Sequence, residues 1–127
     1  MRTLRILCGL IFACVASVAL AGTATLSWVN PTAYTDGSAL TLASVNVYRA
    51  TSGSGPWTKI GSVAESATTP VTTWTDATAV AGTTEYYYVT ALDAAGNESA
   101  PSNTASKAIP APTPNAPTKV VITGATG

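Results

Sequence analysis

Short stretches rich in Thr, Val, Ser, Tyr and Trp run from Gly22 to Ile109, and each is bounded by Gly, Pro, Asp or Asn. Branched and aromatic residues in short runs between turn-forming residues favour β-strands. No segment of this region carries apolar residues at helical spacing for more than one turn. We therefore expect an all-β fold, with strands at residues 23–29, 44–50, 57–64, 72–76, 85–93 and 103–108.

The alternation of side chains along these stretches predicts which face of each strand is buried, because successive side chains on a strand point to opposite faces. Val45 and Val47 in residues 44–50, and Tyr87, Val89 and Ala91 in residues 85–93, each occupy alternate positions and form one face suited to a core. Trp28 is the largest apolar side chain of the first strand, so we expect it at the centre of the core. The predicted core consists of Leu26, Trp28, Val45, Val47, Tyr87, Val89 and Ala91.

The first 21 residues have a different pattern. Arg2 and Arg5 precede an almost unbroken apolar run, and Ala19-Leu20-Ala21 supplies small residues for cleavage before Gly22. This is the pattern of a secretory signal peptide. The run is short for a membrane span of ~20 residues, and no basic cluster follows it. We expect the leader at residues 1–21 to be removed and the mature chain to act in the periplasm or outside the cell, without a membrane attachment.

Both cysteines, Cys8 and Cys14, lie in this leader, so the mature chain is expected to fold without a disulfide. Lipidation at Cys14 is disfavoured, because Phe12 is a poor fit to a lipoprotein site and the apolar run continues past Cys14. Cleavage also removes two of the six basic residues, which leaves four against six acidic residues and a net charge of −2. That balance does not favour nucleic acid or an anionic membrane as a partner.

Residues 110–127 differ from the body of the chain. Four prolines between Pro110 and Pro117 indicate a semi-rigid linker. A short apolar stretch follows and is expected to form one more strand, a candidate donor strand made of Lys119, Val120, Val121, Ile122 and Thr123. The predicted organisation is a leader at 1–21, a β-sandwich domain at 22–109, and a linker with a short strand at 110–127.

Several motifs carry a family resemblance. They are Leu26-Ser27-Trp28, Val45-Asn46-Val47-Tyr48-Arg49, Trp74-Thr75-Asp76, Tyr86-Tyr87-Tyr88-Val89-Thr90-Ala91 and residues 93–103. Together they resemble strands B, C, E and F and the turn into strand G of a fibronectin type III domain, in the form found in bacterial extracellular proteins. The resemblance covers residues 24 to about 108. It implies an immunoglobulin-like antiparallel β-sandwich of seven strands, a binding or spacer role, and no catalytic residues.

Two positions depart from the pattern of that family. Glu85 stands where an aromatic residue usually opens strand F, and Tyr86 is expected to replace that aromatic only through a one-residue bulge. Nothing before Leu26 is long enough to form the family's first strand, A, whereas residues 115–120 resemble its opening. We hypothesise that the C-terminal segment acts as strand A beside residues 24–28, in its own chain or in a neighbour; a mobile tail is the alternative.

Residues suited to catalysis or metal binding are scarce. The sequence has no His, the mature chain has no Cys, and its six acids are scattered over loops and strand ends, so we expect no enzyme activity and no cofactor. Asp93, Asn97 and Glu98 share one turn with oxygens that suit calcium, but their spacing does not match a calcium loop. We expect an ordinary turn in which Gly96 and Asn97 adopt unusual backbone angles.

Three tyrosines form the candidate contact face. Tyr48, Tyr86 and Tyr88 are expected to point outward together, because the strands that carry them are neighbours in the family that the chain resembles. Exposed rings stack on sugars or pack against proteins, and tyrosine pairs also simply stabilise a sheet; the residues leave both roles open. We expect a secreted, non-catalytic module with a protein-binding, adhesion or surface-assembly role, including homo-oligomers formed by strand exchange. The alternatives are a carbohydrate-binding accessory protein that takes a cell-surface polysaccharide, and a passive spacer.

Overall fold

The computed structural model describes residues 21–66, 68–124 and 126, and its secondary structure consists of β-strands. The strands are β1 (Ala21–Ser27), β2 (Leu42–Ala50), β3 (Thr58–Ala64), β4 (Thr73–Val80), β5 (Thr84–Asp93) and β6 (Ala105–Ala108). The predicted signal peptide and its two cysteines lie outside the described residues, apart from Ala21, which opens β1.

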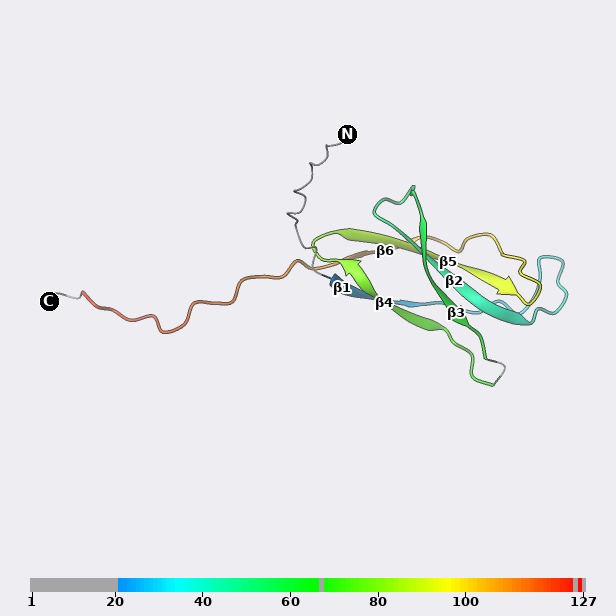
Figure 1. Ribbon diagram of the computed structural model, residues 1–127, viewed down its shortest axis with the longest axis horizontal. Helices are drawn as coiled ribbons and strands as arrows, with labels where there is room; N and C mark the ends of the chain where they lie inside the picture. Colours follow the sequence, from blue (N-terminus) through cyan, green and yellow to red (C-terminus); the bar gives the residue numbers. More distant parts are fainter. Residues whose placement is uncertain (1–20, 67, 125, 127) are drawn as a thin grey trace, which may run out of the picture.

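The strands form two antiparallel sheets that pack against each other as a sandwich (Figure 1). One sheet holds β1 and β4, and the other holds four strands in the order β3-β2-β5-β6. The predicted all-β antiparallel sandwich is therefore confirmed. The described residues contribute six strands to it, whereas the family resemblance implied seven.

The predicted strand positions agree with the structure to within two residues, except at the end of β4. That strand was expected to stop at Asp76 but continues to Val80, where Ala79 and Val80 pair with Gly22 and Ala21. Acidic side chains are almost never fully buried unless they are paired. The prediction was wrong because the Asp76 side chain is buried, with 1% of its surface exposed.

The core lies between the two sheets. Ala24, Val47, Ala79, Tyr87 and Ile109 form its buried cluster, and Leu26 and Val89 pack against that cluster while half-buried. Of the predicted core residues, Val45, Val47 and Tyr87 are buried, and Leu26, Val89 and Ala91 are half-buried.

Trp28 does not lie at the centre of the core. Its ring is half-buried and outside the buried cluster, and its indole nitrogen donates a hydrogen bond of 2.8 Å to the side chain of Asn30. The prediction placed it centrally because it is the largest apolar residue of its strand. It fails because no strand among the described residues lies beyond β1 to cover this part of the sandwich.

The bulge considered for Tyr86 is absent from the pairing of β5 with β2. The two strands stay in register from Ser44 opposite Leu92 to Ala50 opposite Tyr86, so Tyr86 remains on the outer face. Glu85 therefore points into the sandwich, where 1% of its surface is exposed.

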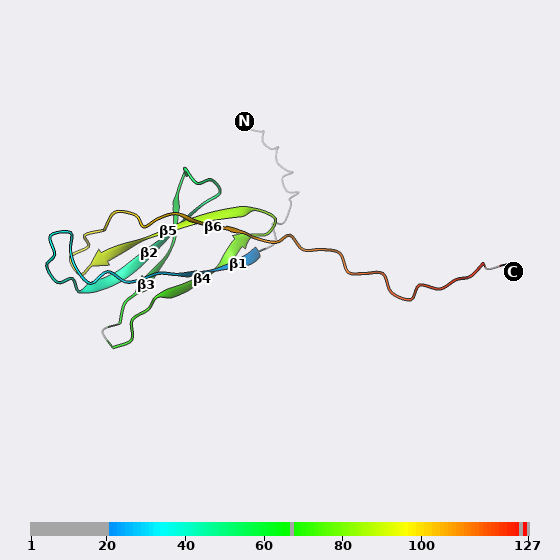
Figure 2. The same cartoon turned by 180° about the vertical axis from the view of Figure 1, so that it is seen from behind.

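Beyond Ile109 the chain leaves the sandwich as an extended tail, which both views show running away from the strands (Figures 1 and 2). Residues 110–124 form no strand and are exposed throughout. The short C-terminal strand that the sequence predicted is thus not formed within a single copy of the chain.

Candidate functional site

The outer edge of β1 is the most unusual feature of the sandwich. β1 is hydrogen-bonded to β4 on one side, and among the described residues nothing pairs with its other side. An unpaired strand edge presents a row of backbone donors and acceptors that favours pairing with another strand.

The register of β1 shows which backbone groups point to this open edge. The N–H of Trp28 donates to the carbonyl of Thr72 at 2.9 Å, so Trp28 points its backbone groups toward β4. Hydrogen-bonding direction alternates along an antiparallel strand, so Leu26 also bonds toward β4, whereas Thr25 and Ser27 turn their N–H and C=O groups outward. The hydroxyl contact of 3.0 Å between Thr25 and Thr75 suits such a non-hydrogen-bonded pair, in which side chains approach closely.

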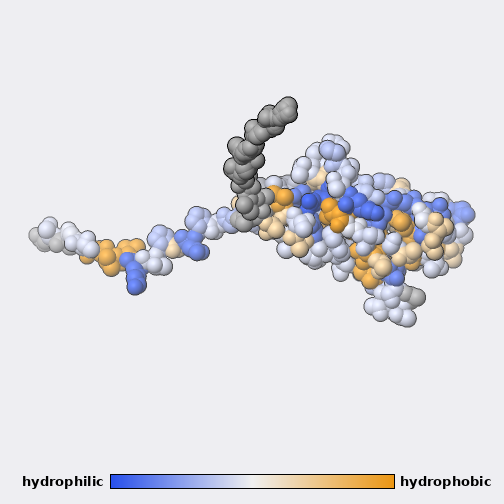
Figure 3. Space-filling view, in the orientation of Figure 1, coloured by the Kyte–Doolittle hydropathy of each residue, from blue (hydrophilic) through white to orange (hydrophobic). Residues whose placement is uncertain are grey.

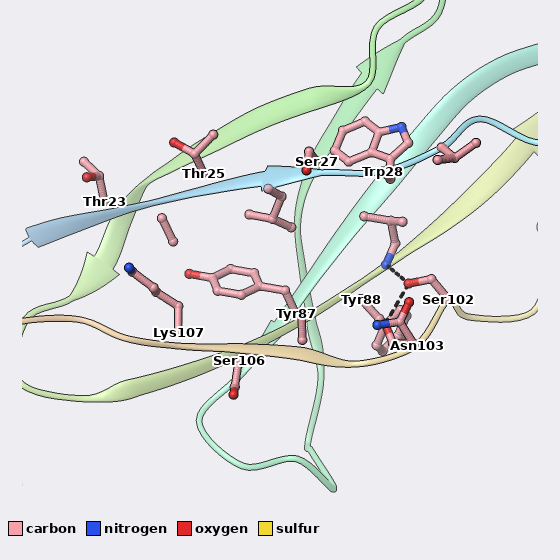
Figure 4. Close-up of a pocket in the computed structure, with 15 residues that line it drawn as sticks. Thr23, Thr25, Ser27, Trp28, Tyr87, Tyr88, Ser102, Asn103, Ser106 and Lys107 are labelled. Carbon is pink, nitrogen blue, oxygen red and sulfur yellow. Dashed lines mark hydrogen bonds between the residues drawn. The ribbon is translucent and has the colours of Figure 1, made fainter.

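A groove of about 910 Å³ lies beside this edge, between β1 and the segment that leads into β6 (Figure 4). Leu26 of β1 and Trp28, directly after β1, form one wall, and Tyr87 and Val89 of β5 line its base. A smaller hollow of about 170 Å³ shares Trp28 and Val89 with it and extends it past the end of β1. Leu26, Trp28 and Val89 are only half-buried because their side chains face an open groove rather than a neighbouring strand.

The opposite wall is more polar. Ser102 and Asn103 lie at one end, and Ala105 and Lys107 of β6 at the other. In Figure 4 the Lys107 side chain projects into the space between β6 and β1, whereas Ser106 points away from it. The groove is therefore apolar at its Trp28 end and charged at its Lys107 end. A charged side chain that points inward at a sheet edge discourages unspecific strand pairing there.

The tail begins at the Ala21 end of this groove. Ile109 is buried and fixed there by two hydrogen bonds, from its N–H to Thr83 and from Gly82 to its carbonyl. Its side chain lies so close to Gly22 that a Cβ at that glycine would overlap it. The point at which the tail leaves the sandwich is therefore rigid.

The candidate donor strand lies far along this tail and is fully accessible. Val120, Val121 and Ile122 have 87%, 71% and 85% of their surface exposed. Figure 3 shows a separate hydrophobic patch on the tail, away from the sandwich. Three consecutive exposed branched apolar residues mark a segment suited to contact with another surface.

The three tyrosines of the candidate contact face lie on one face of the sheet, but their rings are not equally free. Tyr48 and Tyr88 stack on each other with ring centres 4.8 Å apart and an interplanar angle of 19°. Trp57, which was not predicted as part of this face, meets Tyr88 edge-on with ring centres 4.6 Å apart. Tyr48 and Tyr88 each cover one ring face of the other, and Trp57 also contacts the Tyr88 ring, so this geometry favours sheet stabilisation over sugar stacking; the contact role stays a prediction.

Glu98 is held against this face by hydrogen bonds. One of its oxygens accepts hydrogen bonds from the hydroxyl of Tyr48 at 2.7 Å, from Thr90 and from the side-chain amide of Asn46. The bonds from Thr90 and Tyr48 lower the pKa of Glu98. This carboxylate therefore locks the start of the β6 segment over the sheet.

The turn after β5 is closed by Asp93. Its two carboxylate oxygens accept bonds from the backbone of Ala95 and Asn97, the side chain of Asn97 and the hydroxyl of Tyr34, all between 2.8 and 3.0 Å. Gly96 takes a φ of 87°, as expected, but Asn97 does not adopt a positive φ, so that part of the prediction is wrong. No group of three or more acidic, His or Cys residues that could hold a metal ion occurs in the part of the chain that the structure describes.

Sequence reasoning missed a buried charge cluster beneath the four-stranded sheet. Arg49 donates to Asp76 at 2.8 Å and lies 3.8 Å from Glu85, and Tyr87 donates its hydroxyl proton to Asp76 at 2.9 Å. The sequence could have indicated this cluster, because Arg49, Glu85 and Tyr87 lie at alternate positions that face inward with the core valines. The partners come from β2, β4 and β5, so only the assembled fold brings them together.

The described residues contain no helix that could span a membrane. No protein-family model matches the sequence, and no curated protein matches it either. A domain of the human KIAA0970 protein, solved in solution as a fibronectin type III domain, shares the fold, with a TM-score of 0.56, 21% identity and coverage of 89% of this chain and 82% of that one.

An Fn3-like protein from Clostridium thermocellum, solved as a crystal structure, shares 30% sequence identity with this chain. It superposes with a TM-score of 0.52, and the match covers 74% of this chain and 81% of that one. The match covers most of this solved relative and agrees with the resemblance of the sequence motifs. The chain belongs to the fibronectin type III family.

Proposed function

We propose that the protein is a non-catalytic binding and assembly module that acts outside the cytoplasm and accepts an extended segment as an added strand in the groove between β1 and β6. The observation that carries this proposal is the open outer edge of β1 beside half-buried Leu26 and Trp28. The leader-like residues 1–21 support the extracytoplasmic location.

Strand addition uses two kinds of contact, and the groove supplies both. Main-chain hydrogen bonds give affinity, and pockets for alternate side chains give specificity. Thr25 and Ser27 offer the backbone groups, while Leu26, Trp28 and Val89 offer apolar surface for every second side chain of the incoming segment. The edge of seven-residue β1 is about 23 Å long, enough for a segment of five to seven residues.

The fold alone does not decide this function, because sandwiches of this kind carry many functions. Sugar binding has weaker support, because Tyr48 and Tyr88 each cover one face of the other's ring. A passive spacer role also has weaker support, because an open apolar groove exposes a sheet edge to unwanted pairing.

Selection of random peptides on the sparsely immobilised full chain, isolated after export, tests the proposal without assuming the natural segment. Thr25→Pro is the informative variant: it removes an outward N–H while leaving the backbone hydrogen bonds between β1 and β4 in place. Thr25→Val is its matched control. We expect selected peptides with alternating apolar residues to lose at least about tenfold in affinity for Thr25→Pro only. Binders that are insensitive to Thr25→Pro would contradict the proposal.

A further inference from the structure

We infer that the segment that fills the groove is the C-terminal segment of a second copy of this chain, so that copies join head to tail. The inference rests on the proposed function and names its partner. The occupant is the stretch made of Lys119, Val120, Val121, Ile122 and Thr123, called the donor segment below.

The side chains of the donor segment alternate in the way that the groove requires. In an extended strand Val120 and Ile122 fall on one face, and Lys119, Val121 and Thr123 fall on the other. The first face is purely apolar, whereas the second carries a charge and a hydroxyl and suits solvent. Val120 and Ile122 lie about 6.6 Å apart in a strand, the same repeat as Leu26 at the end of β1 and Trp28 directly after it.

The length of the donor segment also fits. Five residues in a strand span about 16 Å, less than the roughly 23 Å of the β1 edge. Placed in the groove, the two apolar side chains cover Leu26, Trp28 and Val89, the predicted core residues that a single copy leaves half-buried.

The path of the tail favours a second copy over its own sandwich. The tail leaves at the Ala21 end of β1, but a strand antiparallel to β1 must begin at the Ser27 end. The linker, residues 110–118, would have to fold back along nearly its full extended length of about 28 Å. Its prolines stiffen it against such a reversal, and both views show the tail directed away from its own sandwich (Figures 1 and 2).

The same direction leads into a neighbour. A tail that runs outward from one copy meets the Ser27 end of the next copy, where the smaller hollow beside Trp28 opens the groove. The donor segment then runs toward Ala21 of that neighbour, antiparallel to its β1. The neighbour's own tail remains free, so the contact does not close and adds further copies.

Two complementary full-length variants test the inference. Val120→Asp combined with Ile122→Asp blocks the donor segment and keeps the groove; Thr25→Pro blocks the groove and keeps the donor segment. We expect the unchanged chain, isolated after export, to form larger species as its concentration rises in sedimentation velocity. Each variant alone should stay monomeric, and an equimolar mixture should form dimers of one copy of each and nothing larger. Val121→Asp, which changes the solvent face, should assemble like the unchanged chain.

The outcomes separate the inference from the proposed function. A mixture that stays monomeric overturns the inference, and the proposed function survives only if selected peptides still bind and lose affinity with Thr25→Pro. A monomeric unchanged chain whose melting temperature falls when the donor segment is blocked shows that the tail completes its own sandwich, which also overturns the inference. If selected peptides also ignore Thr25→Pro, both ideas fail.

Discussion

The interior of the sandwich holds the carboxylates of Asp76 and Glu85 and the guanidinium of Arg49. Burial by itself would raise the pKa of Asp76, but hydrogen bonds from Thr78, Arg49 and Tyr87 outweigh burial and lower it. Burial and the bond to Asp76 raise the pKa of Tyr87 far above its ordinary value, so its hydroxyl stays protonated as a donor. Glu85 receives bonds from Val80 and Thr83 on one oxygen, while its other oxygen has only the 3.8 Å approach of Arg49.

We expect Arg49→Met to lower the free energy of unfolding by about 3–5 kcal/mol at pH 7, because it leaves two buried carboxylates without their cation. Denaturant unfolding measures the change. Lys59→Met is the control, because Lys59 is exposed on β3. It should change the free energy of unfolding by less than about 0.5 kcal/mol. Adding Glu85→Gln to Arg49→Met should recover part of the loss, since it removes one uncompensated charge; no recovery would contradict the cluster as described.

At the scale of single residues the sequence predicts burial well where alternation decides it. Val45, Val47 and Tyr87 follow the period-two pattern and are buried. It fails for Trp28, whose burial depends on whether another strand covers the groove. It fails for Glu85 too, because a carboxylate is buried only when a partner such as Arg49 meets it from another strand.

The turn between β5 and β6 is the element that depends most clearly on pH. The side chain and backbone of Asn97 and the hydroxyl of Tyr34 donate to Asp93 and lower its pKa to about 2. In an unfolded chain the pKa of Asp is about 3.9. The ionised turn therefore adds stability above about pH 4, and that contribution is lost as the pH falls from about 4 to about 2.

We expect the melting temperature of the unchanged chain to fall between pH 4 and pH 2, and Asp93→Asn to flatten that fall. The variant should also melt lower than the unchanged chain at neutral pH, because the amide loses the charge-assisted bonds of the turn. Thermal unfolding followed by circular dichroism at a series of pH values checks both expectations. An identical pH dependence in the two proteins would show that Asp93 does not link the turn to stability.

Elements are predicted better than their contacts. Branched and aromatic runs between turn residues located all six strands, because local preference and burial point the same way there. The end of β4 and the stacking of Tyr48 on Tyr88 depended on neighbouring strands. The groove itself could be anticipated only indirectly, from the expectation that the C-terminal segment takes the place of the family's first strand.

At the scale of the whole molecule, the sandwich and the tail supply complementary parts that a single copy does not join. The groove offers an unpaired edge and half-buried apolar side chains, and the tail offers an exposed apolar segment on a stiff linker that starts at a fixed point. Strand addition would complete the cover of Trp28 and satisfy the outward backbone groups of Thr25 and Ser27 in one step.

Amide hydrogen exchange of β1, resolved by residue, tests the acceptance of a strand most directly. The amides of Leu26 and Trp28 bond toward β4 and should be protected in both the assembled chain and the donor-blocked variant, which makes them the internal reference. The amides of Thr25 and Ser27 should exchange freely in the donor-blocked variant and at least about tenfold more slowly in the assembled chain. Equal, unprotected exchange of Thr25 and Ser27 in both proteins would contradict the claim that the groove accepts a strand.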